Sequence, residues 1–512
     1  MVGSQSKPAA TRSIGTSLIN MKHAGIFILT IWALVSCSSD NLTPDDPIVS
    51  DGAANVGPVV DVDVLRYVIS GEDVTVTGAA SDTDGTVVSQ AWSQISGDPV
   101  VLSDDTAGLG SFTAPDVVEI TDLEFAFTAT DDDGFEGGRV VTITVLPSNL
   151  LRAQLGLLTG ADVTAARTTN TTEILESTTT SSAADISTGG TFALRLNDVS
   201  DDEWIMVSVS GGTDIDTNND GIVDAVPVDN NGTIRAIARA AEWRSPGLVV
   251  STLSEVAVQQ LINISESLDG MSAQSMEIRL STMVWELLTA DLNDDETFDY
   301  LDLVAYQRDD AGVLNTDTLS AESLAAIADQ LRSADAATAG AAITNLFNFD
   351  SFATVETNLG TFKLELFPNI VPDTAGNFIT LSRRGFYEDL IFHRVVAGFV
   401  IQGGDPLANG TGGASMIGDT FDDEFDPSLS NLQYTVAMAN SGPDTNNSQF
   451  FINLADNTEL DFDKSPLTSA HSVFAEVVEG QSVIDDIGAV EVGSTNLPLS
   501  AVRMKSIIIS RE

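Results

Sequence analysis

An acidic segment near the middle of the chain carries oxygen-bearing side chains at alternate positions, as a calcium loop requires. Asp216, Asn218, Asp220 and Asp224 supply the oxygen atoms, and Gly221 stands where such a loop turns sharply. In so acidic a chain, the alternative interpretation is a solvated acidic turn. The spacing predicts a candidate calcium site that would stabilise the fold rather than take part in catalysis.

A second acidic segment follows an apolar stripe with helical spacing. Its oxygen atoms come from Asp291, Asn293, Asp295 and Asp302, and the segment resembles a dockerin or EF-hand loop between two helices. Glu296 occupies the position of the usual turn glycine, and Asp302 replaces the bidentate glutamate, as in dockerin-type loops. We expect structural calcium here too, with an acidic turn again as the alternative.

The C-terminal third contains several distinctive motifs in a fixed order. The first runs Phe392-His-Arg-Val-Val-Ala-Gly-Phe-Val-Ile-Gln-Gly-Gly-Asp405, and Gly410-Thr-Gly-Gly413 and Phe421-Asp-Asp-Glu424 follow it. The last is Met438-Ala-Asn-Ser-Gly-Pro-Asp-Thr-Asn-Asn-Ser-Gln-Phe-Phe-Ile452. Together these motifs resemble the cyclophilin family of peptidyl-prolyl cis-trans isomerases.

The resemblance implies a closed eight-stranded antiparallel β-barrel with two capping helices and a substrate groove on the outside of the barrel. It implies an enzyme that needs no cofactor for catalysis and acts on proline-containing polypeptides. An X-Pro bond isomerises over a barrier of about 18–20 kcal/mol, because twisting the bond breaks the amide resonance. By resemblance, the catalytic residues are Arg394, Phe399, Gln402, Phe451 and His471, and the substrate-binding residues are Val400, Ala439, Asn440, Gln449 and Leu460.

The sequence departs from the family pattern at the rim of this groove. Glu459 stands where the family has a tryptophan, Asn447 where a glycine is common, and residues 462–470 form a longer link than usual. Because Arg394 is retained, catalysis remains the favoured interpretation. The alternative function is a surface binding or adhesion lipoprotein whose cyclophilin-like domain holds proline-containing peptides without isomerising them.

The single cysteine lies at the end of a short apolar run. Residues 21–36 begin with a basic stretch, continue through apolar residues 24–35 and precede Cys37. The run is too short to span a bilayer as a helix but suits a signal peptide. The Leu-x-small-Cys ending resembles a bacterial lipobox, which implies lipidation of Cys37. An ordinary secretory signal is the alternative. We therefore expect a lipid-anchored envelope protein at the outer membrane, on its periplasmic or surface face.

The elements that must position these residues fall into several modules. We expect a signal region (1–36), a tether (37–54), an immunoglobulin-like β-sandwich resembling PKD domains (55–148), a second small β-sandwich (150–245), a helical block (246–350) and the isomerase domain (352–512). Period-two alternation, as in Leu123, Phe125 and Phe127, predicts the strands of the first sandwich. The Ser/Thr-rich stretch 168–182 is predicted to be a loop, and Thr252 to Glu255 a helix-capping box.

Composition excludes several classes of partner and site. Lys and Arg total 22 and Asp and Glu total 75, which gives a formal charge of −53 that repels nucleic acid. One cysteine allows no intrachain disulfide, and three histidines argue against a His-rich metal centre. A hydrophobic fraction of 43% over 512 residues supports several packed cores, so the expected fold class is multidomain and mainly β.

Overall fold

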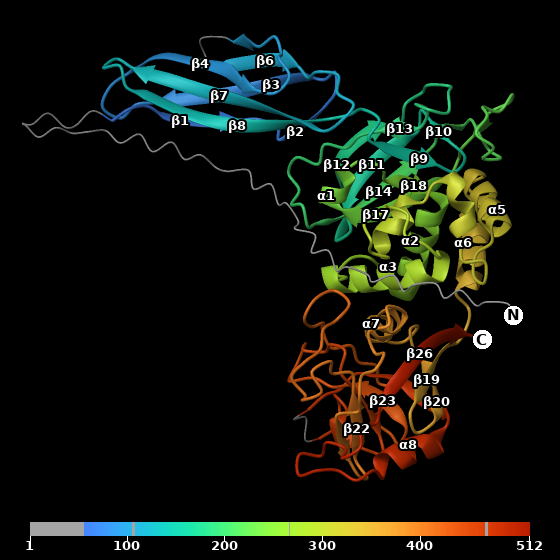
Figure 1. The fold of residues 1–512 in the computed structure, drawn as a ribbon. Coiled ribbons are helices and arrows are strands. Elements are labelled where there is room, and N and C mark those ends of the chain that lie inside the picture. The colour runs from blue at the N-terminus through green and yellow to red at the C-terminus, as the bar shows by residue number, and fades with distance from the viewer. Residues whose placement is uncertain (1–55, 105–107, 266, 466–468) are drawn as a thin grey trace, which may run out of the picture. The chain divides into compact units, whose positions relative to one another are not determined.

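The computed structural model describes residues 56–104, 108–265, 267–465 and 469–512 (Figure 1). The predicted signal region, Cys37 and the tether lie outside the described residues. Within the described part of the chain, each helix is too short or too polar to cross a membrane.

The first module is a sandwich of two four-stranded sheets, with strand orders β1-β3-β6-β5 and β2-β8-β7-β4. Leu123, Phe125 and Phe127 of β7 are fully buried, as their alternation predicted, and Trp92 packs on Phe127 between the sheets. The strands are β1 (Val59–Asp63), β2 (Tyr67–Ile69), β3 (Asp73–Ser81), β4 (Val87–Ser96), β5 (Ser103–Asp104), β6 (Leu109–Thr113), β7 (Thr121–Asp131) and β8 (Glu136–Leu146).

The next segment contributes a four-stranded antiparallel sheet of order β12-β11-β14-β17 and two three-stranded sheets, β13-β9-β18 and β10-β15-β16. Its elements are β9 (Leu151–Gln154), β10 (Leu158–Thr159), β11 (Asp162–Arg167), β12 (Asn170–Thr179), β13 (Thr191–Phe192), β14 (Trp204–Ser210), β15 (Thr213–Asp214), β16 (Val228–Asp229), β17 (Thr233–Arg239), α1 (Ala240–Trp243) and β18 (Val249–Ser251).

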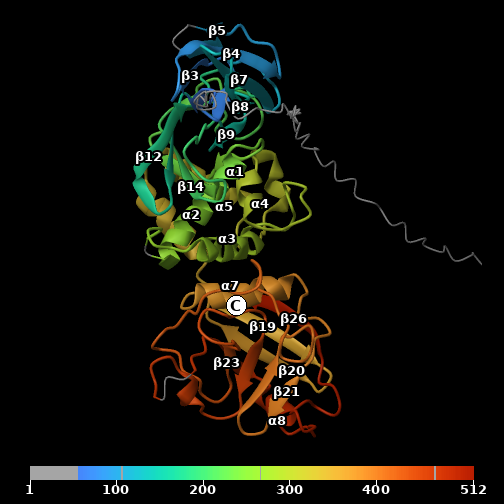
Figure 2. The same cartoon turned by 90° about the vertical axis from the view of Figure 1, so that its left-hand side faces the viewer.

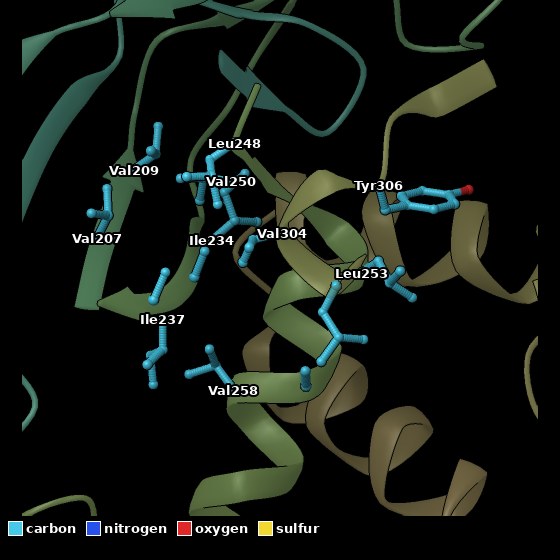
Figure 3. Close-up of a cluster of buried hydrophobic side chains, with 14 of the residues drawn as sticks. Val207, Val209, Ile234, Ile237, Leu248, Val250, Leu253, Val258, Val304 and Tyr306 are labelled. Atoms are coloured by element: carbon cyan, nitrogen blue, oxygen red, sulfur yellow. The ribbon is translucent and has the colours of Figure 1, made fainter. Parts of the chain in front are cut away.

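The helices that follow pack on this sheet system and share its core. Val207 and Val209 of β14, Ile237 of β17 and Leu253 and Val258 of α2 belong to one buried cluster, drawn in part in Figure 3. The expected division at residues 245 and 246 therefore falls inside one core. The elements are α2 (Thr252–Ser265), α3 (Ala273–Leu287), α4 (Tyr300–Ala305), η1 (Arg308–Val313), α5 (Ala321–Arg332) and α6 (Ala336–Leu346).

Two local expectations were wrong. The Ser/Thr-rich stretch is not a loop, because most of it forms β12 and pairs with β11; β-branched threonines suit a strand. The cap of α2 is one residue earlier than predicted. Ser251 and Ser254 each accept a hydrogen bond from the other's backbone N–H, while Glu255 forms an ion pair with Arg235.

The C-terminal module is an antiparallel eight-stranded sheet that curls, with strand order β21-β22-β24-β23-β25-β20-β19-β26. An antiparallel bridge between Ile391 and Arg503 joins its two ends. Figure 2 shows α7 at one end of this sheet and α8 at the other, as expected. The elements are β19 (Ser351–Thr357), β20 (Thr361–Leu366), α7 (Pro372–Arg383), β21 (Arg394–Val396), β22 (Val400–Gly403), β23 (Thr435–Met438), β24 (Phe450–Asn453), η2 (Thr458–Leu460), β25 (Val473–Glu479), α8 (Gln481–Gly488) and β26 (Met504–Arg511).

Candidate active site

The side chains on the two faces of strand β24 belong to different apolar clusters. Phe450 and Ile452 belong to the core inside the barrel, whereas Phe451 belongs to a separate apolar cluster on the other face. Successive side chains of a strand point to opposite faces, so Phe450 faces the core inside the barrel, whereas Phe451, only 5% exposed, packs in the cluster on the outer face. We name the surface group the outer cluster; it contains Val400, Ala437, Phe451 and Val473, with Phe399, Leu429, Ala439 and Leu460 packed against it.

Strand register places the key polar and apolar side chains in one row. Arg394 of β21 pairs with Gln402 of β22, which pairs with Phe451 of β24, followed by Ala437 and Val473 on the next two strands. Directly opposed residues in adjacent strands share a face of the sheet. The row therefore sets a guanidinium, an amide and an apolar patch side by side.

A chain of hydrogen bonds holds the arginine of this row. The Arg394 Nη1 donates to Oε1 of Gln402 at 3.2 Å, and the Nε2 of Gln402 donates to Oε1 of Gln449 at 2.9 Å. The Nε2 of Gln449 donates in turn to the backbone carbonyl of Gly412 at 2.6 Å. Side chains fixed in this way lose little further freedom when a ligand binds, which is the value of a preorganised site.

His471 lies against the outer cluster in one defined tautomer. Its ring meets Phe451 edge to face at 5.2 Å between centroids. Nδ1 lies 2.8 Å from the Met438 carbonyl oxygen, which can only accept, so Nδ1 carries the proton and Nε2 accepts from the Ser469 hydroxyl. Burial lowers the pKa of His471 below its ordinary value, so the ring is neutral at pH 7.

The strip next to His471 contains the residues expected to hold a peptide backbone. The Ala439 N–H donates to the Gln449 carbonyl oxygen at 2.9 Å, which continues the pairing of β23 with β24. The Asn440 Nδ2 donates to the Ala470 carbonyl oxygen at 2.9 Å. The structure thus brings the ten residues named by resemblance onto one face of the barrel and its adjoining loops.

The rim shows how the departures from the family pattern are accommodated. Glu459 in η2 is exposed. Phe462, at the start of the longer link, stacks on Phe425 with 4.9 Å between centroids. Asn447 fits because its Oδ1 accepts the Gln449 N–H at 2.8 Å and its side chain packs on Gly413.

His393, next to the arginine, faces inward. It is 6% exposed, and burial lowers the pKa of its imidazole. Its position agrees with a structural role.

The first acidic loop folds around its own backbone. The Asp216 carboxylate accepts the N–H groups of Asp220 and Gly221, and the Asp224 carboxylate accepts from the backbone and hydroxyl of Thr217. Asn218 donates to Asp220 at 2.9 Å. The segment therefore forms a turn held by its own carboxylates.

The second acidic loop has the same construction. Asp291 accepts the N–H groups of Asn293, Asp294 and Glu296. Glu296 adopts the left-handed conformation with φ of +68°, so the turn forms without the usual glycine. Asp302 serves in the capping box of α4; burial raises its pKa to about 6. Asn293 donates to Asp295 at 3.0 Å. In the described part of the chain, no group of three or more His, Cys, Asp or Glu side chains is arranged to hold a metal.

Sequence reasoning missed the residues that support the groove from other segments. Gly412 receives Gln449, Ser469 fixes the His471 tautomer, and Asp423 lies 3.5 Å from the Asn440 amide. Only Ser469 is near its partner in the sequence; the others are separated by 17 to 37 positions. No spacing rule would have found those pairs.

Comparisons with known proteins agree with this geometry. Residues 352–509 match the family model described as cyclophilin type peptidyl-prolyl cis-trans isomerase, and residues 67–145 match the K319L-like PKD domain. Peptidyl-prolyl cis-trans isomerase-like 1 of Gibberella zeae is 41% identical over 160 residues, which cover 31% of this chain and 94% of that protein.

Two further matches concern the same region. Peptidyl-prolyl cis-trans isomerase cyp15 of Rhizopus delemar is 44% identical over 158 residues, 31% of this chain, but only 24% of that longer protein is covered. A cyclophilin type isomerase of Cryptosporidium parvum, crystallised in the presence of the dipeptide Ala-Pro, is 33% identical with a TM-score of 0.29; the match covers 31% of this chain and 98% of that one. Through its C-terminal domain, this chain belongs to the cyclophilin-type peptidyl-prolyl cis-trans isomerases.

Proposed function

We propose that the chain is an envelope-anchored isomerase that accelerates X-Pro isomerisation during the folding of exported proteins, with Arg394 as its central catalytic group. The observation that carries the catalytic assignment is the row Arg394, Gln402, Phe451 on the outer face of the barrel. This row supports the assignment because it sets a guanidinium held by Gln402 beside the apolar outer cluster.

The physical requirement of the reaction explains this pairing. In the ground state the prolyl nitrogen shares its lone pair with the carbonyl, and the pair localises on nitrogen only as the bond twists. A donor aimed at that nitrogen is bound more strongly in the transition state than in the ground state, which is the condition for catalysis. The Arg394 guanidinium, held by Gln402 at 3.2 Å, is placed to be this donor.

The other residues bind rather than react. The outer cluster buries the proline ring against Phe451, Val400 and Leu460, where removal of apolar surface from water stabilises the complex. Asn440 and Ala439 lie beside this pocket and hold the flanking backbone. His471, neutral and fixed by Met438, forms the pocket wall without exchanging a proton.

The test is the rate of cis-to-trans conversion of a short X-Pro peptide with the full chain. Arg394→Ala should lower kcat by about tenfold to a hundredfold, because a hydrogen bond to a charged group is worth roughly 1.5–3 kcal/mol. Arg394→Lys should restore only part of the rate, since an ammonium lacks the planar fork. Lys505→Ala is the matched control. It removes an exposed cation on β26 and should leave the rate unchanged.

Two outcomes would overturn the catalytic assignment. If the parent chain binds the peptide but does not accelerate conversion, the domain is a binding module of an adhesion lipoprotein. If the parent accelerates conversion and Arg394→Ala does so equally well, another group acts on the prolyl nitrogen.

The envelope location rests on the N-terminal sequence alone. Cys37 at the end of the lipobox-like run is the proposed lipidation site, and Ser38 and Ser39 after it favour the outer membrane. Cys37→Ala should move the protein from the detergent phase to the aqueous phase after phase separation of an expressing bacterium's extract. Equal partitioning of variant and parent would contradict the anchor.

Calcium is proposed as a structural ion of the two acidic loops. The support is the alternate spacing of side-chain oxygens in each loop, together with the turned backbone that Asp216 and Asp291 hold by accepting N–H groups within the loop.

A further inference from the structure

Helix α3 of the helical block packs directly on α7 of the isomerase domain. A Cβ built on Gly376 of α7 would lie 2.7 Å from the Thr282 hydroxyl and 3.2 Å from the Ile278 side chain, so the glycine permits the close approach. Ile278 of α3 is 1% exposed and is part of the barrel's own core cluster. Only residues 347–350 connect α6 to β19. The block therefore behaves as a fixed part of the isomerase domain.

Ion pairs fasten α3 at both ends of this contact. In the middle of the helix, Arg279 donates to Asp373 at 2.6 Å and lies 3.5 Å from Glu424. Near its end, Glu286 pairs with Arg383 at 2.8 Å and with Arg511. These side chains are between 10% and 17% exposed, and breaking one partner of such a buried pair leaves a costly unpaired charge.

One end of α3 also holds a loop of the isomerase domain, Thr420–Glu424, which we name the bridging loop. Gln274 of α3 donates to the Thr420 carbonyl oxygen at 3.0 Å and accepts the Asp422 N–H at 3.3 Å. The Glu424 carboxylate accepts the N–H groups of Asp373 and Thr374 at the start of α7. Arg279 thus lies between two carboxylates that both belong to the isomerase domain.

The bridging loop reaches the substrate groove on its other side. Asp423 accepts from Asn446 at 2.8 Å and from Asn440 at 3.5 Å. The Glu424 N–H donates to the hydroxyl of Ser472, the residue after His471. Adjacent residues of one loop therefore contact the helical block and the peptide-holding strip.

Electrostatics explains why the loop depends on the arginine. Burial, followed by the nearby Asp373, raises the pKa of Glu424 to about 7, while Arg279 opposes that rise. Ser275 donates to the other oxygen of Asp373 at 2.6 Å, and Ser265 accepts from Arg279 at 2.7 Å. Without the guanidinium, two carboxyl groups would face each other in a desolvated space, which would raise the pKa of Glu424 further and weaken the charge-assisted hydrogen bonds that hold the loop.

We propose that Arg279, supplied by the helical block, is a positioning residue of the isomerase: it fixes the bridging loop and, through Asp423, the orientation of Asn440 toward the bound peptide. This inference rests on the proposed function of the groove. It gives the helical block a role in substrate binding.

The experiment compares alanine variants of two ion-paired residues of α3, Arg279 and Glu286, in the full chain. Arg279→Ala should raise KM for an X-Pro peptide by about three- to tenfold with kcat nearly unchanged, since the row containing Arg394 is not touched. Glu286→Ala breaks the ion pairs near the end of α3 and should lower the melting temperature without changing KM. Arg279→Lys should recover part of the affinity.

Each result bears on a different statement. If Arg279→Ala and Glu286→Ala raise KM equally, α3 only stabilises the domain and the inference is wrong. The inference is also wrong if Arg279→Ala leaves KM unchanged in an active chain. A parent chain without isomerase activity would instead refute the proposed function. Should Arg279→Ala fail to fold, Gln274→Ala removes two contacts to the bridging loop and should still raise KM about twofold; no change in KM would overturn the inference.

Discussion

The acidic loops and the isomerase groove are built on opposite principles. In the loop that begins at Asp216, the carboxylate of that residue accepts the N–H groups of Asp220 and Gly221, four and five positions along the chain. In the groove, the row from Arg394 to Val473 crosses five strands. A local motif specifies its own backbone conformation, whereas the groove exists only after the barrel has closed.

This difference decides what a substitution can reveal. In the loops, each carboxylate lies close in sequence to the backbone that it holds, so a substitution there should change calcium binding and local folding together. In the groove, adjacent residues can serve unrelated purposes, as Phe450 and Phe451 do. Function and stability can therefore be separated in the groove by single changes.

The largest expected effect separates these two phenylalanines. Phe451→Ala should raise KM by about ten- to a hundredfold, because it removes the ring against which the bound proline would pack, an apolar contact worth roughly 1.5–3 kcal/mol. Phe450→Ala should instead reduce the free energy of unfolding by about 3–5 kcal/mol. Peptide kinetics and urea unfolding measure the two effects. Loss of stability without a change in KM for Phe451→Ala would place that ring in the core.

The next effect concerns the loops. If calcium binds the folded chain alone, a concentration one hundred times Kd adds about 2.7 kcal/mol of stability, which calorimetry with calcium and then a chelator would detect. Asp220→Asn and Asp295→Asn change exposed ligands and assign the gain to one loop or the other. An unchanged melting temperature would leave only the acidic-turn interpretation.

A pH-dependent effect on stability concerns the bridging loop, which lies between the helical block and the groove. Because the pKa of Glu424 is raised to about 7 from an ordinary 4.5, its contribution to stability is present below pH 4.5 and lost as pH rises through 7. The parent should therefore lose stability between pH 5 and 8 by up to about 1.4 kcal/mol per pH unit more than Glu424→Gln. Parallel stability curves for the two chains would contradict this assignment.

The smallest expected effect is that of pH on catalysis, which should stay constant around neutrality. His471 has a pKa below its ordinary value because it is buried, so it stays neutral above pH 6.5, and the proposed catalysis by Arg394 needs no proton exchange. The kcat, which should not depend on the bridging loop, is therefore expected to be flat from pH 6.5 to 8. A titration of kcat centred above pH 6.5 would show that His471 has a role beyond forming the pocket wall.

The sequence predicted most of what depends on alternation or on contiguous motifs. The buried Leu123, Phe125 and Phe127 follow from period two. The barrel, its capping helices and its family followed from motifs that keep their order along the chain.

What the sequence could not predict are contacts that depend on distant partners. The cap of α2 was misplaced because Glu255, which completes a capping box on paper, instead pairs with Arg235. The strand β12 was missed because a stretch rich in Ser and Thr was interpreted as low-complexity loop, although its residues pair with β11. Arg279 lies 94 positions from Asp373 and carries no motif.

Gly376 has a consequence for engineering and for the interpretation of related sequences. Inside an isolated helix, replacing glycine with alanine gains about 0.5–1 kcal/mol, because the backbone loses less entropy on folding. Here the added methyl group would collide with Thr282 and Ile278, so the same replacement should destabilise the full chain. Whether Gly376→Ala raises or lowers the stability of the full chain thus shows whether a second helix packs on α7. In related sequences, a glycine at this position indicates that there is room for such a helix.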